Sequence, residues 1–539
     1  MGNCHVPSKP NFLFIVTDQQ RADHLSCAGN PVLKTPNIDR IAASGTRFSR
    51  FYATSPICMP ARASLMTGRM PSAHGLRGNG IPLSTDATTV TELLRESGYR
   101  TALIGKCHLQ SMMSEPALEQ RPTVDLTKTP PPPHLAEAVK PHPGEGPYDQ
   151  ELEPLWINNP GHHLALPYYG FEHVDLCINH GDLVYGDYGR WIEEQHPGSE
   201  SLRGPANALP ADIVAPEAWR TRIPVDLYPT TYIADRTIDY LRGYAGENSD
   251  QPFFLQCSFA DPHHPFTPPG HYFDLYRPED INLPRSFNQP LNESIAQVRY
   301  VRTLLDSGAR DIDVGFAYAV TEAEVRQAIA LTYGMIALID DCVGRVMAAL
   351  ADLDLARETI VVFTSDHGDF MGDHRLLLKG PLHYQGVIRV PFIWSDPADR
   401  EQVAVCDRLA SGLDFVPTVL DRAGLQPFNG VQGTSLLPLT RESSQSLHQS
   451  ILIEEENQRN LFGVNAPPRA RTLLTEDRRV SIYNEPGWGE LYDLKNDPDE
   501  MRNLWNDPAS LEMKSQMLEA LARKMLDLGD RSPFPTMRA

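Results

Sequence analysis

The stretch ICMPARASLMTGR, residues 57–69, puts a cysteine at the head of a predicted helix. Pro60 suits the first turn of a helix, where its missing N–H costs nothing, so Cys58 falls at the helix N-terminus. Unpaired backbone N–H groups and the positive end of the helix dipole favour an anion or an anionic nucleophile there. Arg62, one turn further on, can point back to the same place. Taken alone, the stretch also fits a helix-capping cysteine with Arg62 in a surface ion pair.

Two pairs of potential metal ligands follow two apolar runs. Asp18 and Gln19 come after NFLFIVT, and Asp366 and His367 come after TIVVFTS. Carboxylate oxygens, an amide oxygen and an imidazole nitrogen can together bind one divalent cation. Each pair alone is also typical of a turn or a helix cap, but two such pairs at two strand ends predict a metal site.

Further basic side chains follow two more apolar runs. His263 and His264 come after FFLQCSF, and Lys106 and His108 come after YRTALI. Lys106 and His108 alternate, so on an extended segment both would face the same side. The lysine would supply charge, and the histidine can move protons near neutral pH. Lys379, in LLLKGPLHYQG, is another candidate for binding an anion, although a lone lysine is most often solvated surface.

These residues need a sheet that brings strand ends together. Three continuous apolar runs are typical of central strands of a parallel α/β sheet, at 11–18, 252–266 and 359–369. Polar residues directly after such strands lie where open α/β sheets bind ligands. Helical patterns occur between the runs, at 88–99 and 324–350. In the second of these helices we interpret Asp340 and Asp341 as a solvated face.

The chain of 539 residues is too long for one ordinary core. We predict an α/β fold with a large, mixed, mostly parallel central sheet flanked by helices, and a smaller C-terminal antiparallel sheet with a helix. The predicted boundary separates a catalytic domain, 1–426, from a subdomain, 427–539. Within the first, residues 110–242 are rich in proline and poor in periodicity. They predict a loop-rich insertion, a lid that sets substrate choice.

The charge balance limits the partners. A formal net charge of -21 argues against a nucleic-acid partner and gives no attraction to an anionic membrane. An anionic substrate would therefore need a local positive pocket. The N-terminal sequence has neither a signal peptide pattern nor an apolar run long enough to span a membrane, so we expect a cytoplasmic protein. The eight cysteines lack CxxC spacing, which predicts mostly buried, reduced thiols.

The motifs together resemble the type I sulfatase family of the alkaline phosphatase superfamily, and the related phosphonate monoester hydrolases. Residues 58–62 fit the CxPxR signature of that family. TDQQ, PNIDRIAASGTRF, GKCHL, DPHHPF, SDHGD and ELYDLKNDPDEMRNL also appear in family order. The resemblance covers nearly the whole chain apart from the insertion, and it implies an alkaline phosphatase-like catalytic domain.

In that family a separate formylglycine-generating enzyme oxidises the signature cysteine to Cα-formylglycine, whose aldehyde hydrates to a geminal diol. The resemblance implies that Cys58 is the nucleophile precursor, and that sulfate monoesters are hydrolysed through a covalent sulfated hemiacetal. The resemblance also implies that a metal is bound by Asp18, Gln19, Asp366 and His367 together with the group at position 58. Arg62 would stabilise the diol, Lys106 and Lys379 would bind the non-bridging oxygens, and His108 would act as the base. His263, beside His264, would contact the leaving oxygen, and Asn79 would contact the substrate.

The resemblance leaves the substrate class and the metal open. Gln19 and His367 are similar to the phosphonate monoester hydrolase pattern, and they make Mn²⁺ as well as Ca²⁺ an expected ion. Lys106 and His108 instead fit the sulfatase pattern. We therefore expect hydrolysis of aryl or alkyl sulfates, with phosphonate monoesters or phosphodiesters as the alternative. A binding protein without chemistry and an enzyme that uses the Cys58 thiolate are two further hypotheses. Because members of the family are often oligomeric, we also expect a homo-oligomer.

Overall fold

The computed structural model describes residues 9–115, 128–129, 131–135, 138–140, 142–247, 250–310, 312, 316–442, 444–464 and 466–538. Within these residues, nine strands form a central sheet in the order β12-β2-β11-β9-β1-β7-β4-β5-β6. The five consecutive strands from β9 to β5 run parallel. Their bounds are β1 (Asn11–Thr17), β4 (Arg100–Gly105), β5 (His173–Ile178), β7 (Phe253–Ser258) and β9 (Thr359–Ser365).

The edges of the sheet make it mixed. Strand β11 (Phe392–Ser395) runs antiparallel to β9 and to β2 (Thr46–Phe48), and β12 (Val405–Cys406) extends that edge. At the other edge β6 (Tyr185–Gly186) runs antiparallel to β5. The prediction of a large, mixed and mostly parallel sheet is confirmed.

The burial of strand β1 on both faces explains why its sequence is continuously apolar. Phe12 and Phe14 belong to one buried core, while Leu13 and Ile15 belong to a second core on the opposite face. Because side chains alternate across a strand, a strand covered on both faces needs apolar residues at every position.

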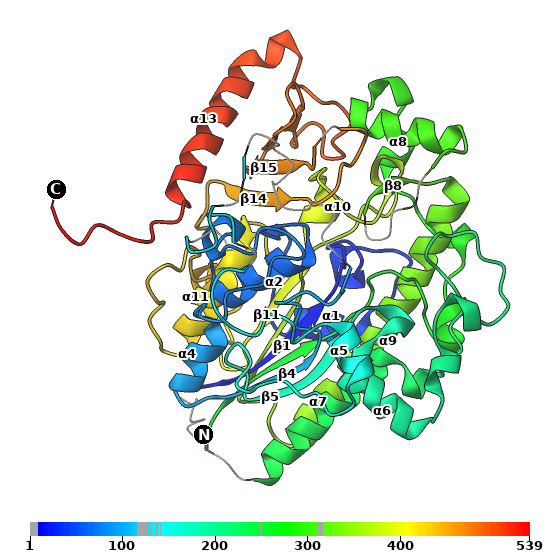
Figure 1. Ribbon diagram of the computed structural model, residues 1–539, viewed down its shortest axis with the longest axis vertical. Helices are drawn as coiled ribbons and strands as arrows, with labels where there is room; N and C mark the ends of the chain where they lie inside the picture. Colours follow the sequence, from blue (N-terminus) through cyan, green and yellow to red (C-terminus); the bar gives the residue numbers. More distant parts are fainter. Residues whose placement is uncertain are drawn as a thin grey trace.

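Helices cover both faces of the central sheet (Figure 1). The core that contains Phe12 includes residues of α2 (Cys58–Thr67), α4 (Val90–Glu96) and α11 (Phe415–Arg422). The other core includes residues of α1 (Pro36–Ala43), α7 (Pro229–Gly246) and α9 (Glu322–Asp352). The shorter helices are α3 (Pro71–His74), α5 (Glu153–Asn158), α6 (Asp187–Gln195), α8 (Ala296–Asp306), α10 (Gln385–Ile388) and α12 (Leu437–Arg441). Two further two-stranded sheets pair β3 (Phe51–Tyr52) with β13 (Ala410–Ser411) and β8 (Tyr318–Ala319) with β10 (Leu376–Leu377).

The interpretation of Asp340 as part of a solvated helix face was wrong. Asp340 is 1% exposed, whereas Asp341 is exposed as predicted. The Asp340 carboxylate accepts hydrogen bonds from the backbone N–H groups of Asn37 and Ile38, at 3.1 and 2.8 Å. These N–H groups lie at the start of α1 and have no partner inside their own helix, so a carboxylate from α9 satisfies them.

The segment 110–242, predicted as a loop-rich insertion, contains regular elements as well as loops. It includes β5, β6, α5, α6 and most of α7. Strand β5 is part of the central sheet, since Ile104 of β4 pairs with Asp175. Only its last three residues are fully buried, which explains why its apolar run was too short to be recognised as a strand of the sheet.

The C-terminal part is a small antiparallel sheet with a helix, as predicted. The strand order is β14 (Ile451–Glu456), β15 (Arg469–Leu474), β16 (Arg478–Tyr483) and β17 (Gly489–Asp493). Helix α13 (Leu511–Asp527) packs on this sheet through Met517 and Leu521, which join Leu473 and Val480 in one core. Figure 1 shows α13 along the outer side of this sheet. Among the described residues, none of the helices combines the length and apolarity that a membrane crossing needs.

Candidate active site

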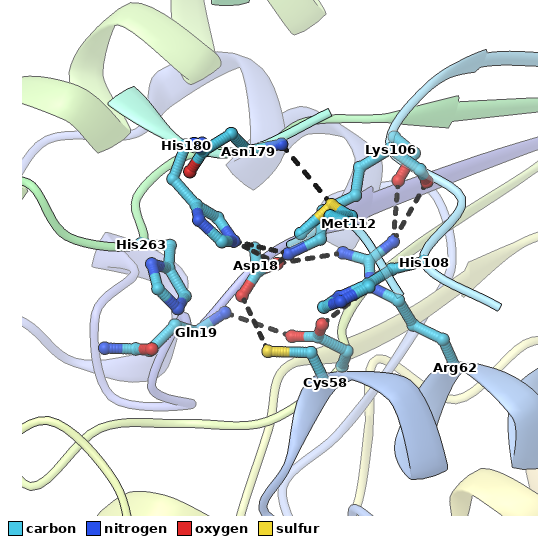
Figure 2. A network of polar contacts seen from close by, with 12 residues as sticks. Asp18, Gln19, Cys58, Arg62, Lys106, His108, Met112, Asn179, His180 and His263 are labelled. Atoms are coloured by element: carbon cyan, nitrogen blue, oxygen red, sulfur yellow. Dashed lines mark hydrogen bonds and ion pairs between the residues drawn. The ribbon is translucent and has the colours of Figure 1, made fainter. Parts of the chain in front are cut away.

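Four parallel strands deliver the predicted residues to one edge of the sheet. Asp18 and Gln19 directly follow β1, and Asp366 and His367 directly follow β9. His263 lies in the loop after β7, and Lys106 directly follows β4. Figure 2 shows Gln19, Lys106 and His263 gathered around Asp18. The carboxyl ends of adjacent parallel strands thus form the site, as the topology requires.

Cys58 is the first residue of α2 and is 1% exposed. Its Sγ lies 3.1 Å from Nε2 of His367 and 3.8 Å from Oδ1 of Asp18. The N-cap residue Ile57 makes no side-chain cap, so the N-terminal N–H groups of the helix are directed toward this end of the site. The prediction of a cysteine at a helix N-terminus, next to the metal-ligand candidates, is confirmed.

Lys379 is buried beside Cys58. Its Nζ donates to Sγ of Cys58 at 3.1 Å, to Oε1 of Gln19 at 2.9 Å and to Nε2 of His263 at 2.8 Å. The loop that follows β10 carries this lysine into the site from a distant part of the sequence. Lys379 is therefore an interior residue of the site rather than a solvated surface lysine.

Arg62 links the two carboxylates of the site. Its Nε donates to Oδ2 of Asp366 at 2.8 Å, and a terminal nitrogen lies 3.4 Å from Oδ2 of Asp18. Its other terminal nitrogen donates to Oγ of Ser258 and to the backbone oxygen of Lys106. Arg62 therefore fixes the two acids relative to each other, one helical turn after Cys58.

The surrounding cations change the acidity of the site. Burial raises the pKa of Asp18, but Lys106 and Arg62 outweigh it and hold that pKa well below its usual range. Burial and Asp18 raise the pKa of the Cys58 thiol, but Lys379 and Lys106 outweigh them and lower it. The site thus favours an anion at position 58.

Lys106 follows β4 and is completely buried. Its Nζ donates to Oδ2 of Asp18 and lies 2.6 Å from Nε2 of His180. His180 was not predicted as a site residue. It comes directly after Asn179, which follows the end of β5, so the signal that identified Asp18, a polar residue after an apolar run, was present in VDLCINH. The run was missed because only three of its residues are strongly apolar.

His108 is buried near Lys106 and Arg62, but the prediction that it lies on an extended segment, on the same side as Lys106, was wrong. Its φ is 60°, so the segment after β4 is turned rather than extended. Its backbone N–H donates to the carboxylate of Glu151 at 2.7 Å, and Glu151 also accepts from the next two N–H groups. Burial, together with Lys106 and Arg62, lowers the pKa of His108 well below its usual value, so its imidazole is neutral at pH 7.

His263 and His264 stack, with ring centroids 4.0 Å apart. Nδ1 of His263 donates to the backbone oxygen of His264 at 2.5 Å, and its Nε2 accepts from Lys379. Nδ1 of His264 lies 3.3 Å from the amide nitrogen of Gln19, which also donates to Asp369 at 2.6 Å. His263 therefore faces the lysine, and His264 supports Gln19.

Asn79 lies next to the start of α2. Its Oδ1 accepts from the backbone N–H of Met59 at 3.2 Å. Its side chain thus satisfies one of the free N–H groups of the helix that carries Cys58. The predicted contact with substrate stays a prediction for its amide nitrogen.

The donor set fits a divalent cation. Ligand atoms of Asp18, Cys58, Asp366 and His367 all lie within 4.8 Å of one another, and all four residues are buried. Buried carboxylates in one cluster need cations to offset their charge, and two carboxylates with one imidazole can together bind a divalent metal ion. Gln19 contributes its amide oxygen to the same space, where it lies beside Lys379.

Known proteins are similar to this chain along almost its whole length. The family model described as "Sulfatase" matches residues 10–425, and the model "N-sulphoglucosamine sulphohydrolase, C-terminal" matches residues 372–527. The chain is 27% identical to an arylsulfatase of Clostridium perfringens, over 96% of this chain and 94% of that protein. It is 30% identical to the multifunctional alkaline phosphatase superfamily protein PehA of Trinickia caryophylli, over 93% of this chain and 92% of that protein.

A solved structure has a similar fold over almost the whole chain. The phosphonate monoester hydrolase of Agrobacterium radiobacter aligns with a TM-score of 0.74 and 25% identity, over 97% of both chains. The family model, the relatives and the solved structure agree on the family and the fold of this chain. The chain belongs to the sulfatase family, within the alkaline phosphatase superfamily.

Proposed function

We propose that the protein hydrolyses sulfate monoesters, with aryl sulfates as substrates, after Cys58 has been converted to Cα-formylglycine. The observation that carries the proposal is the position of Cys58. Its Sγ lies 3.1 Å both from the Lys379 ammonium and from Nε2 of His367, beside Asp18. A nucleophile and the anionic group it attacks would both be stabilised there.

The group at position 58 would supply the nucleophile, and the metal would supply the positive charge that activates it. Formylglycine offers an oxygen nucleophile in its hydrated form, and a divalent cation offers positive charge to activate that oxygen. Asp18, Gln19, Asp366 and His367 would hold the cation, which we propose to be Ca²⁺ or Mn²⁺. A formylglycine-generating enzyme is then a required partner during maturation.

The other residues would bind and move protons. Lys106 and Lys379 would bind the non-bridging oxygens of the sulfuryl group, where negative charge accumulates. His263, which accepts from Lys379 through Nε2, would contact the leaving oxygen. His108 is neutral, and its buried Nδ1 has no hydrogen-bond partner within the described residues, so it is available as a proton acceptor.

A second candidate is hydrolysis of phosphonate monoesters or phosphodiesters by the same residues. The phosphonate monoester hydrolase of Agrobacterium radiobacter, with a TM-score of 0.74, supports it. So does the 30% identity to the protein described as multifunctional. Sulfuryl and phosphoryl groups both present charged non-bridging oxygens to the two lysines, which is why one site can serve both.

The experiment that separates the two is a comparison of kcat/KM on p-nitrophenyl sulfate and on p-nitrophenyl phenylphosphonate, with enzyme produced together with a formylglycine-generating enzyme. The proposal expects the higher value for the sulfate. A higher value for the phosphonate would replace it by the second candidate, and turnover of neither would favour a binding protein. The cytoplasmic location and the homo-oligomer stay predictions from the sequence.

A further inference from the structure

His180 lies inside the site, although neither the motifs nor the implied family roles include it. It is 7% exposed and sits in the loop that follows β5, the fifth parallel strand. Among the described residues of the segment 110–242, His180 contacts both Lys106 and His263 (Figure 2). Two of its contacts and the conformation of its neighbours suggest a specific task.

The first contact is with Lys106. Nε2 of His180 lies 2.6 Å from Nζ of Lys106, and the ammonium also donates to Oδ2 of Asp18. An ammonium has donors only, so Nε2 of His180 must accept, which places the ring proton on Nδ1. Two of the three N–H groups of Lys106 are thereby directed at the protein, and this fixes the direction of the third N–H group.

The second contact is with His263. The two rings stack with centroids 3.6 Å apart and an angle of 13° between their planes. His263 itself accepts from Lys379 at 2.8 Å. Each lysine of the site therefore donates to its own histidine, and the two histidines lie face to face. The ring of His263 is thus packed between the rings of His180 and His264.

The third observation is the strained frame that holds His180. Asn179 has a φ of 75° and Gly181 a φ of 54°, so both neighbours adopt the left-handed conformation. The side chain of Asn179 donates to Glu153 at 2.7 Å and accepts from the N–H of His180. A Cβ at Gly181 would lie 2.9 Å from atoms of Pro265 and Thr267. Strained backbone persists where the surrounding structure holds it, often at functional sites.

We propose that His180 is a positioning residue of this sulfatase site, which aims the Lys106 ammonium at the sulfuryl oxygens and holds the His263 ring against the leaving oxygen. The inference rests on the proposed function. The proposal gives His180 two effects, one on Lys106 and one on His263, and a different substitution removes each of them. His180→Phe keeps a flat ring on His263 but removes the acceptor for Lys106. His180→Gln keeps an acceptor within reach of Lys106 but removes the ring.

The test measures kcat and KM of each variant on p-nitrophenyl sulfate and on phenyl sulfate, whose leaving group is poorer. H180F should lower kcat/KM about 10- to 100-fold, the size typical of losing a partner that orients an active-site group, and equally on both substrates. H180Q should lose more on phenyl sulfate than on p-nitrophenyl sulfate, because His263 is no longer held at the leaving oxygen. H173F is the matched control, since His173 is the first residue of β5, the strand that precedes His180, and its side chain is 45% exposed.

Sulfate binding measured by calorimetry, and Tm, separate this role from a purely structural one. H180F should weaken sulfate binding while its Tm stays near that of the wild type, because its ring still fills the space. The inference would be overturned if H180F and H180Q both kept a sulfate affinity and a kcat/KM within about twofold of the wild-type values. If the wild type turns over no sulfate ester, the proposed function fails, while the effect of H180F on sulfate binding still decides whether His180 positions Lys106.

Discussion

The ammonium of Lys379 lies 3.1 Å from the sulfur of Cys58, and both groups are buried. The two residues are separated by 321 positions in the chain. This contact joins the start of α2 to the loop after β10, and it puts a fixed positive charge at the position where the formylglycine oxygen would lie. An ammonium in a buried site acts on a developing negative charge far more strongly than one in water.

Replacement of Lys379 by methionine should therefore remove catalysis while keeping most of the side-chain volume. We expect kcat/KM on p-nitrophenyl sulfate to fall roughly 10²- to 10³-fold, as for loss of one charge-stabilising donor. The matched control is K34M, because Lys34 is exposed and its side-chain ammonium donates to the backbone oxygen of Pro31, away from the site. Activity of K379M close to that of the control would show that the ammonium does not act on the reacting group.

Replacement of Arg62 by lysine should weaken metal binding. A lysine cannot reach both Asp366 and Asp18 as the guanidinium does, so the two carboxylates lose their common support. We expect the apparent metal affinity to fall about 10- to 100-fold, measured as metal content after dialysis and as the metal concentration that restores activity. The exposed Arg40 offers the control R40K, and equal metal content in R62K and R40K would refute this role.

Much of this site follows from the sequence because its residues come directly after long apolar strands. The positions of Asp18, Asp366 and Lys106 could be predicted from the rule that the carboxyl ends of parallel strands lie at one edge of a sheet. His180 was missed because β5 has a short apolar run, and Glu151 because its task is to accept three backbone N–H groups of another segment. Asp340 was misinterpreted for a similar reason. Its partners, the N–H groups of α1, are 302 and 303 residues away, and no local pattern reveals such a contact.

Replacement of His108 by alanine should slow the second half of the reaction more than the first. The expected time course on p-nitrophenyl sulfate is a rapid release of about one equivalent of p-nitrophenol per active site, followed by a steady rate roughly 10²- to 10⁴-fold below the wild type, the usual size of a lost general base. Stopped-flow absorbance measures both phases. A steady rate equal to that of the wild type would contradict the role of His108, and so would a uniform slowing without a burst.

Removal of the divalent metal should abolish activity reversibly. Asp18 and Asp366 would then repel each other, with Arg62 and Lys106 as their remaining counter-charges. We expect dialysis against a chelator to reduce kcat/KM to background, and addition of Ca²⁺ or Mn²⁺ to restore it. Circular dichroism of the dialysed protein checks that the fold survives. Full activity at a metal content near zero would refute the metal site.

Asp340 should make the stability of the fold depend on pH. Burial raises its pKa to about 6, above the ordinary 3.8. A raised pKa in the folded state means that its contribution is fully present below about pH 4 and is lost as pH rises through about 6. The stability of the wild type relative to D340N should therefore fall by up to about 3 kcal/mol between pH 4 and pH 7, as 1.4 kcal/mol accompanies each pKa unit.

Urea unfolding of both proteins at several pH values measures this difference. D352N is the control, because Asp352 is an exposed residue at the end of the same helix. D352N measures how the loss of an exposed carboxylate from the same helix changes the free energy of unfolding at each pH. A D340N difference that stays constant from pH 4 to pH 7, or that grows with rising pH, would contradict the burial argument.

The most direct test of the account is the mass of the tryptic peptide FYATSPICMPAR, residues 51–62, from active protein. The account predicts the lower mass that results when the CH₂–SH group of Cys58 becomes an aldehyde, and a peptide that reacts with an aldehyde-specific hydrazide. A cysteine that alkylates quantitatively in fully active enzyme would contradict the formylglycine mechanism and leave a thiolate enzyme as the explanation.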